Sequence, residues 1–290
     1  MTPFKRHILR FGAAFSTLLL LCAVAFFLGH IIVKGAPALS LSLIFGDVSP
    51  MDALLFKERV FDGLFPAICG TACLVILAVT LSLPLGVLTG IWLSHMAKGR
   101  WKALLSVAMD TLAGVPSIVV GLFGFSAAIM LHRATHGKVG PSLLISAATL
   151  GVLVLPGITR NTQLALEAIS QETRLVAMAM GASRVQAIFR VYLPMASPGI
   201  FRGAILALGR CAEDTAAIML TGVVATAGSP YAIFGKYEAL PFAIFTIASE
   251  YSGPHELARG YSAALILLVL CVLLFGLSAL LARRFHPLQS

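Results

Sequence analysis

The chain has 290 residues, of which 59% are hydrophobic and 11% are charged, and its mean hydropathy is +0.95. Soluble domains carry roughly 25% charged residues, so water cannot be the main solvent of this chain. The formal net charge of +9 would suit a nucleic-acid-binding protein, but the distribution of the charges along the chain, given below, argues against that class.

Six apolar stretches are long enough to cross a bilayer as helices, which takes about 20 residues each. They are residues 11–33, 65–93, 103–131, 141–159, 198–224 and 260–282. The first is longer than the apolar core of a signal peptide, about 7–15 residues, so we expect an uncleaved anchor. We expect an all-α membrane protein in which residues 1–62 form an anchor helix and an outer segment and residues 63–290 form the main transmembrane domain.

The positive charges indicate how the spans are oriented. If both chain ends are cytoplasmic, the inner segments hold twelve Lys and Arg residues and the outer segments seven. The outer segments also carry seven acidic residues, which cancel their bases. This distribution follows the positive-inside rule, so the basic excess is an orientation signal in a multi-pass protein and requires no nucleic acid.

Several spans contain residues that disturb helices. Pro84, Pro116 and Pro156 each lack a backbone donor, which a span tolerates only where neighbouring groups satisfy the freed carbonyl. Gly86 and Gly90 lie four residues apart, a spacing that lets two helices approach closely. Tight packing within one bundle explains this spacing at least as well as a contact between subunits does.

The connections and the sulfur and imidazole side chains give no sign of a metal or cofactor site. Two longer outer connections, 34–64 and 225–259, are rich in turn residues and could carry short helices. His132 and His136 have a spacing that could bind a metal, but two ligands alone do not make a site, and a polar loop is the favoured interpretation. All five cysteines lie in apolar spans, where they behave as small hydrophobic residues.

A segment between the fourth and fifth spans differs from the membrane-like remainder. From residue 160 to 174, polar and apolar residues alternate at helical spacing, and Gly181 then interrupts the pattern. Ser183 and Gln186 have the spacing of a capping box that starts a second short helix. We expect Pro194 and Pro198 to end this helix and start the fifth span. Its apolar side would hold Val185, Ile188, Phe189 and Tyr192. An amphipathic helix on the bilayer surface would explain this composition about as well as a docking element.

Gly181, Val191, Leu193 and Pro194 resemble the cytoplasmic signature of ABC-importer permeases, in which Gly is followed after nine residues by Ile-x-Leu-Pro. The Glu-Ala-Ala that usually opens the signature is replaced by Leu-Val-Ala at residues 175–177. The resemblance implies a six-helix permease of the type I, MetI-like fold, whose coupling loop (residues 160–197) fits a cleft on a separate ATPase subunit. It implies coupling-loop contacts through Ala177, Gly181, Ala182, Ser183, Val185, Ile188, Phe189, Leu193 and Pro194.

Four further segments are similar to permeases of phosphate importers, the last of them to the A-type subunit. These segments are residues 111–124, 155–162, 208–215 and 238–249. The resemblance implies a subunit of the cell inner membrane that carries phosphate. Its implied partners are a second permease subunit, an ATP-binding subunit dimer and a phosphate-binding protein. Permeases for sulfate, molybdate and phosphonate share the coupling loop, so those oxyanions remain alternative substrates.

Arg210 is the candidate substrate-contacting residue. It lies twelve residues after Pro198, about 18 Å along a helix, near the middle of a hydrocarbon core about 30 Å thick. An unpaired charge there costs about 2.5–3.5 kcal/mol, so Arg210 must face protein or water. A guanidinium matches the oxygens of phosphate, and we expect the translocation path to include Arg210, Glu213, Asp214 and Thr215.

Structural roles compete with this assignment. Glu213 and Asp214 follow Arg210 at the i+3 and i+4 positions, where they could neutralise it in a self-contained ion pair. In the resembling permeases Gly and Glu stand where this chain has Glu213 and Asp214, so a fully ionised trio would be net negative. Asp110 and Arg160 lie near the inner interface as possible partners of each other, and we expect them to be structural.

A secondary transporter and an intramembrane enzyme fit the sequence less well than an ATP-driven importer does. The chain contains no Gly-x-x-x-x-Gly-Lys-Ser/Thr phosphate loop, so an ATP-driven importer would need a separate ATPase. A self-sufficient secondary transporter would use Arg210 and its neighbouring acids, but it needs no coupling loop. An intramembrane enzyme lacks the usual catalytic constellations, so we expect no catalytic residues and no cofactor in this chain.

Overall fold

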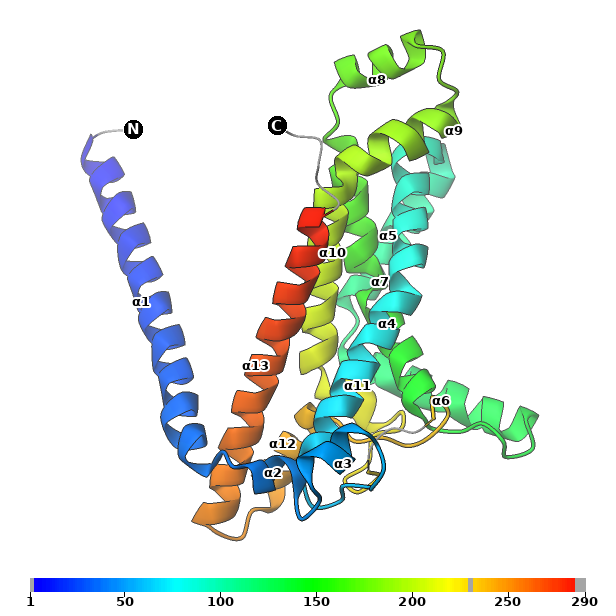
Figure 1. Ribbon diagram of the computed structural model, residues 1–290. Helices are drawn as coiled ribbons and strands as arrows, with labels where there is room; N and C mark the ends of the chain where they lie inside the picture. Colours follow the sequence, from blue (N-terminus) through cyan, green and yellow to red (C-terminus); the bar gives the residue numbers. More distant parts are fainter. Residues whose placement is uncertain (1–2, 229–231, 285–290) are drawn as a thin grey trace.

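The computed structural model describes residues 3–228 and 232–284 (Figure 1). In these ranges six helices are long and apolar enough to cross a membrane. These candidate spans are Arg10–Ala38, Phe65–Met96, Ser117–Ala134, Leu143–Glu167, Arg184–Glu213 and Pro254–Leu280. Apart from one isolated bridge, between Val223 and Tyr237, the described residues form helices, turns and loops. The prediction of an all-α fold with six spans is confirmed.

The helices of the bundle are α1 (Pro3–Gly35), α4 (Phe65–Ile91) with the π-helical turn η2 (Trp92–Met96), α5 (Gly99–Gly114), α6 (Ser117–Ala134), α7 (Leu143–Glu167), α10 (Leu193–Glu213) and α13 (Pro254–Arg284). The coupling loop holds α8 (Gln171–Ala179), α9 (Arg184–Ala187) and the π-helical turn η3 (Ile188–Tyr192). The remaining short helices are η1 (Ala36–Ala38), α2 (Leu41–Phe45), α3 (Pro50–Leu54), α11 (Thr215–Met219) and α12 (Leu240–Glu250). The outer connections therefore carry short helices, as predicted.

The third predicted span, 103–131, is not one helix. It is divided between α5 and α6, and Val115 and Pro116 between them are extended, with ψ angles of 130° and 138°. Pro116 has no N–H to donate and disfavours a helical conformation at Val115, so the helix stops there. Figure 1 shows α6 running across the direction of the bundle instead of along it.

The fifth predicted span, 198–224, is also interrupted. α10 ends at Glu213, and Asp214 takes an extended conformation and accepts a hydrogen bond from the N–H of Ala217 at 3.0 Å. An aspartate whose side chain satisfies an orphan N–H is a preferred start for a new helix, here the five-residue α11. The chain therefore breaks its helix directly after the charged residues.

The fourth predicted span, 141–159, is shorter than the helix. α7 continues through Glu167, so the first eight residues assigned to the coupling loop belong to a span. Pro84 in α4 and Pro156 in α7 stay inside their helices.

Helices α4 and α7 pack closely against each other. A Cβ added at Gly86 would lie 2.6 Å from the Ile158 side chain, and one at Gly90 would lie 2.6 Å from that of Thr162. The Gly86–Gly90 spacing thus serves packing within this chain. Around this contact lies the main hydrophobic core, which α10 and α11 complete.

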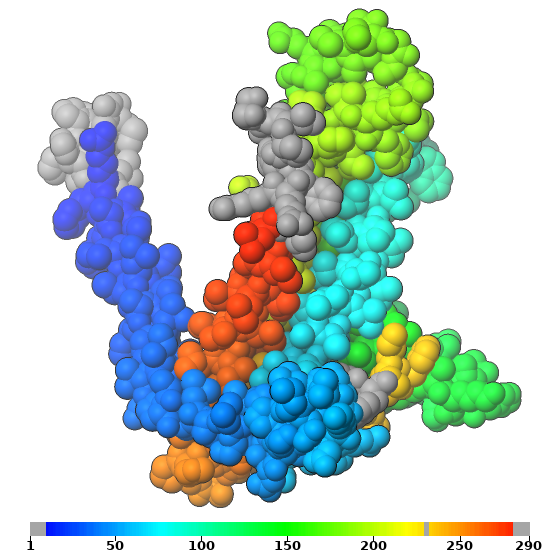
Figure 2. Space-filling view, viewed as in Figure 1, coloured from blue at the N-terminus to red at the C-terminus, as the bar shows by residue number. Residues whose placement is uncertain are grey.

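Helix α1 stands apart from the bundle along most of its length (Figures 1 and 2). The C-terminal end of α1 packs on α13, where the Ser262 hydroxyl donates to the carbonyl of Gly35 at 2.7 Å. The start of α1, the end of α13 and the coupling loop all lie at one end of the molecule (Figure 1). α2, α3 and α12 lie at the other end. That the first end is cytoplasmic stays a prediction from the charge distribution.

The five cysteines are free thiols. His132 Nδ1, in the last turn of α6, is 3.1 Å from the carbonyl oxygen of Val139 in the loop that follows. Among the residues that the structure describes, no group of three metal-ligating side chains is found.

Candidate translocation site and coupling loop

Arg210 lies on an exposed face of α10, one turn before the helix ends. No salt bridge in the described part of the chain involves its guanidinium. The carboxylate of Asp214 instead caps α11, and Glu213 is exposed at the last position of α10. The alternative in which Arg210 pairs with Glu213 or Asp214 on its own helix is therefore not found in the described part of the chain.

Arg210 lines a cavity of about 190 Å³ between α7 and α10. Asn161 of α7 and Gly203 of α10 also line it, and Ala113 of α5 closes one side. Asn161 donates from Nδ2 to the carbonyl of Gly157 at 2.8 Å, which uses one of the two amide hydrogens and leaves the second as a donor. The cavity thus combines one cation with one amide on otherwise apolar walls.

The structure does not gather the four predicted path residues around this cavity. Glu213, Asp214 and Thr215 are absent from its lining, whereas Asn161 belongs to it. Sequence reasoning did not select Asn161, although it lies inside the segment 155–162 that resembles phosphate-importer permeases. Its place on the wall of the same cavity as Arg210 depends on how α7 packs against α10, which no local pattern encodes.

A second cavity, of about 130 Å³, adjoins the first and shares Ala113, Pro156 and Gly157 with it. Asp110 and Arg160 line this second cavity but form no salt bridge with each other in the described structure. Arg160 donates to the Oε1 of Gln163 at 3.1 Å instead.

This hydrogen bond begins a short polar chain along the end of α7. The Nε2 of Gln163 donates to Glu167 at 2.9 Å, and Glu167 forms a salt bridge with Lys102 of α5 at 3.6 Å. The chain ties α5 to α7. Such an interaction agrees with the structural role expected for Arg160, though not with the expected partner.

The coupling loop turns at Gly181, where α8 ends in a Schellman motif. The N–H of Gly181 donates to the carbonyl of Met178 at 3.0 Å, and the N–H of Ala182 donates to that of Ala177 at 3.3 Å. Gly181 has φ = +81°, a conformation that glycine adopts without a Cβ clash. The predicted break of the helix at Gly181 is a tight left-handed turn.

The predicted capping box starts α9. The hydroxyl of Ser183 accepts from the N–H of Gln186 at 3.3 Å, and the Gln186 side chain accepts from the N–H of Ser183 at 2.9 Å. Beyond α9 the helix continues through η3 into α10, so Pro194 and Pro198 do not end it. Pro194 lies in the first turn of α10, where a missing N–H is tolerated.

The predicted apolar side of the second short helix is in fact divided between two faces. Ile188 and Tyr192 are 3% and 5% exposed, and they pack with Ala177 and Ala187 in a second hydrophobic core at the ends of α4, α7 and α10. Val185 and Phe189 are at least half exposed on the other face. The π-helical geometry of η3 shifts residues around the helix axis relative to an α-helical pattern.

The exposed part of the coupling loop is strongly apolar. The large apolar side chains exposed here are Leu175, Val176, Met178, Met180, Val185 and Phe189. Of the other predicted contact residues, Gly181, Ser183 and Pro194 are exposed and Ala182 and Leu193 are half-buried, whereas Ala177 and Ile188 are buried. Several large apolar side chains exposed on a projecting loop are typical of a docking surface.

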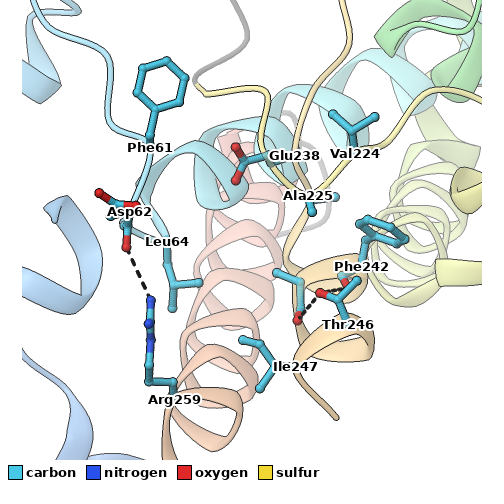
Figure 3. Close-up of a pocket in the computed structure, with 13 residues that line it drawn as sticks. Phe61, Asp62, Leu64, Val224, Ala225, Glu238, Phe242, Thr246, Ile247 and Arg259 are labelled. Carbon is cyan, nitrogen blue, oxygen red and sulfur yellow. Dashed lines mark hydrogen bonds between the residues drawn. The ribbon is translucent and has the colours of Figure 1, made fainter. Parts of the chain in front are cut away.

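At the opposite end of the molecule lies a cavity of about 240 Å³, drawn in Figure 3. Glu238 on its wall is 6% exposed, and it accepts hydrogen bonds from the N–H groups of Ala227 and Gly228 at 2.9 and 2.8 Å. Burial raises the pKa of Glu238, and the two backbone hydrogen bonds oppose that shift. Arg259 donates to the carbonyl of Asp62 at 3.4 Å across the same cavity (Figure 3).

Comparisons with known proteins agree with this geometry. Residues 82–287 match the model of the family described as "Binding-protein-dependent transport system inner membrane component". The chain is 32% identical to the phosphate transport system permease protein PstA of Mycobacterium leprae (strain TN), over 77% of this chain and 72% of the relative. It is 30% identical to PstA of Xylella fastidiosa (strain 9a5c), over 89% of this chain and 85% of the relative.

Among solved structures, the fold is similar to a chain of the MetNI methionine ABC transporter in an inward-facing conformation. The TM-score is 0.57 at 19% identity, covering 82% of this chain and 99% of that chain. Six spans, a projecting helical loop and a MetI-like arrangement define a multi-pass permease of the ABC importer fold. The chain belongs to the family of binding-protein-dependent transport system inner membrane components. Members of this family are transport components that work with a substrate-binding protein.

Proposed function

We propose that this chain is the phosphate-translocating permease subunit of an ATP-driven importer in the cell inner membrane. The observation that carries the proposal is Arg210, a guanidinium without a salt bridge in the described structure, on the wall of a cavity between two spans. The similarity to PstA proteins over most of the chain supports phosphate as the substrate.

The chemistry of the cavity suits an oxyanion. A guanidinium offers donors in a planar fork that matches two phosphate oxygens, and an oxyanion that reaches Arg210 meets no carboxylate already bound to it. Asn161 adds an amide on the facing helix. One cation and one amide bind an anion without enclosing it, which favours release as well as binding.

The energy for transport would come from a separate ATPase subunit dimer through the coupling loop. The exposed apolar residues around Gly181 provide a surface for a cleft on that subunit, although the acidic residue of the usual Glu-Ala-Ala is missing here. A second permease subunit would complete the path, and a periplasmic or extracellular phosphate-binding protein would deliver the substrate at the opposite end.

A self-sufficient secondary transporter is the alternative from another class. Such a protein gains nothing from a projecting apolar loop, which would be costly to expose to water without a partner. The loop therefore favours the ATP-driven importer.

The test is uptake of radiolabelled phosphate into proteoliposomes that contain this chain with its second permease subunit and ATPase, supplied with the binding protein. We expect uptake only with hydrolysable ATP, and competition by phosphate but not by sulfate, molybdate or phosphonate. Uptake in vesicles that lack the ATPase subunit would overturn the proposal in favour of a secondary transporter. Preferred uptake of another oxyanion would keep the importer and correct the substrate.

A further inference from the structure

Three side chains from distant parts of the sequence meet where the coupling loop joins the spans. The rings of His95 and Tyr192 are stacked, with centroids 5.3 Å apart and planes 21° apart. The guanidinium carbon of Arg174 lies 5.9 Å from the centroid of the Tyr192 ring, within range of a cation–π interaction. We call His95, Arg174 and Tyr192 the ring joint.

Each ring lies in a π-helical turn. His95 belongs to η2 at the end of α4, where the N–H of Ala97 donates to the carbonyl of Trp92 at 2.8 Å. Tyr192 ends η3, directly before α10. π-Helical turns are rare, and they are frequently found at functional sites. Because two such turns contact each other through their aromatic rings, we consider this contact a candidate functional site.

Arg174 connects α8 to this contact. Its Nη2 donates to the carbonyl of Leu166, in the last turn of α7, at 2.8 Å. Such a carbonyl has no partner within its helix, and a cation there is favoured by the helix dipole. Buried nitrogens of the joint, Nε of Arg174 and Nε2 of His95, have no hydrogen-bond partner in the described structure. Buried polar groups without a partner are uncommon in folded proteins, so these two nitrogens set the contact apart from ordinary packing.

Little else holds α8 to the spans. It stands clear of the bundle in Figure 1, and Ala177 is its one residue in the second hydrophobic core. Among the hydrogen bonds and ring contacts of the described residues, those of Arg174 are the directional contacts between α8 and the rest of the bundle. A displacement of α8 can therefore reach α4 and α10 through Arg174 and the ring of Tyr192, in addition to the backbone that runs through α9 and η3.

We infer that the ring joint transmits the movement of the coupling loop to α4 and α10, with Arg174 and Tyr192 as positioning residues. The inference rests on the proposed function, because it names the residues through which an ATPase docked on the loop would move the spans. Neither residue contacts substrate. Each acts by holding α8 in a fixed relation to η2 and η3.

The experiment measures the phosphate transported per ATP hydrolysed in the reconstituted complex. We expect Tyr192→Ala and Arg174→Met to lower this ratio about tenfold while ATP hydrolysis continues. Tyr192→Phe keeps the ring and should restore the ratio to within about twofold of wild type. Arg100→Met, an exposed arginine at the start of α5, is the matched control for Arg174→Met and should leave the ratio unchanged.

Three results would overturn the inference. An unchanged ratio in Tyr192→Ala and Arg174→Met would show that the joint transmits nothing. An equal loss in Tyr192→Phe would assign the effect to the hydroxyl instead of the ring. Failure of both Tyr192→Ala and Arg174→Met to assemble, measured by size-exclusion chromatography, would show that the joint only supports the fold. If the wild-type complex itself shows no ATP-driven uptake, the proposed function fails, which is a separate outcome.

Discussion

The isolation of Arg210 is a consequence of how α10 ends. On a continuous helix, Asp214 would lie one turn from the guanidinium, where it could neutralise it. Glu213, the last residue of α10, also lies one turn away but forms no salt bridge with Arg210 in the described structure. Asp214 leaves the helix, and its carboxylate binds the N–H of Ala217 at the start of α11. The guanidinium is then left on the wall of the cavity that Asn161 also lines. An Asp at this position therefore has a structural task that keeps the arginine available.

Replacement of Arg210 tests its role directly. We expect Arg210→Ala to lower phosphate uptake about 10- to 100-fold, because a hydrogen bond to a charged group contributes about 1.5–3 kcal/mol. Arg210→Lys should retain part of the activity, since it keeps the charge but loses the planar fork. The measurement is initial uptake in proteoliposomes.

Arg202→Ala is the matched control, because Arg202 is exposed on the same helix and does not line the cavity. Equal uptake by Arg210→Ala and wild type would return Arg210 to a packing role.

The coupling loop combines a buried face with an exposed one. Ala177, Ile188 and Tyr192 anchor it in the second hydrophobic core, and Met180, 83% exposed, lies at its turn. The Schellman motif at Gly181 reverses the chain between α8 and α9, so the turn conformation sets the direction in which the exposed side chains project. The φ angle of Gly181 therefore sets how α8 and α9 are oriented relative to each other.

Gly181 is the position at which that angle can be tested. A Cβ at Gly181 would meet nothing within 4 Å, so a substitution acts only through its φ of +81°. We expect Gly181→Val to lower ATP-driven uptake about tenfold, since a left-handed conformation costs an L-residue roughly 1–2 kcal/mol. Gly181→Asn should be tolerated, because Asn adopts this conformation readily. Equal uptake by the two variants would show that the turn has no role in coupling.

Across the whole molecule, the first helix depends on a single contact region. α1 is exposed along most of its length and reaches the bundle where Gly35 lies against α13. A Cβ at Gly35 would lie 2.7 Å from the carbonyl oxygen of Tyr261, so only glycine permits this approach. The position of α1 relative to the other spans is therefore sensitive to one residue.

Overpacking at this point should loosen α1. We expect Gly35→Val to destabilise the purified complex by about 1–3 kcal/mol, the usual cost of forcing extra atoms into a packed contact. The measurement is thermal unfolding in detergent. Gly12→Val is the control, since a Cβ there meets nothing within 4 Å. A Gly35→Val variant as stable as Gly12→Val would mean that α1 is held elsewhere.

The sequence allowed the features that depend on local chemistry to be predicted. The capping box at Ser183 and the helix break at Gly181 follow from residues within one turn of each other. The residue types at Pro116 and Asp214 also favour a helix break, but the apolar stretches continue past both residues. Hydropathy alone therefore predicts one uninterrupted span at each place. Two pairings could not be predicted, because each arises only when separate helices pack. They are the shared cavity wall of Asn161 and Arg210 and the cation–π contact of Arg174 with Tyr192.

The tight α4–α7 contact restricts how a passage through this chain can open. With no room for even one methyl group at Gly86 or Gly90, the two helices cannot slide past each other without a collision. They must travel as one body, and α7 forms one wall of the cavity beside Arg210. Gly199 and Gly203 hold α10 as closely against Ala165 and Asn161 of α7, whereas the glycines of α5 meet nothing within 4 Å. We therefore expect opening and closing to come from α5, which contributes Ala113 to the cavity wall. In such a transporter, the wall formed by α7 would keep its position relative to α4, and the passage would open by displacement of α5.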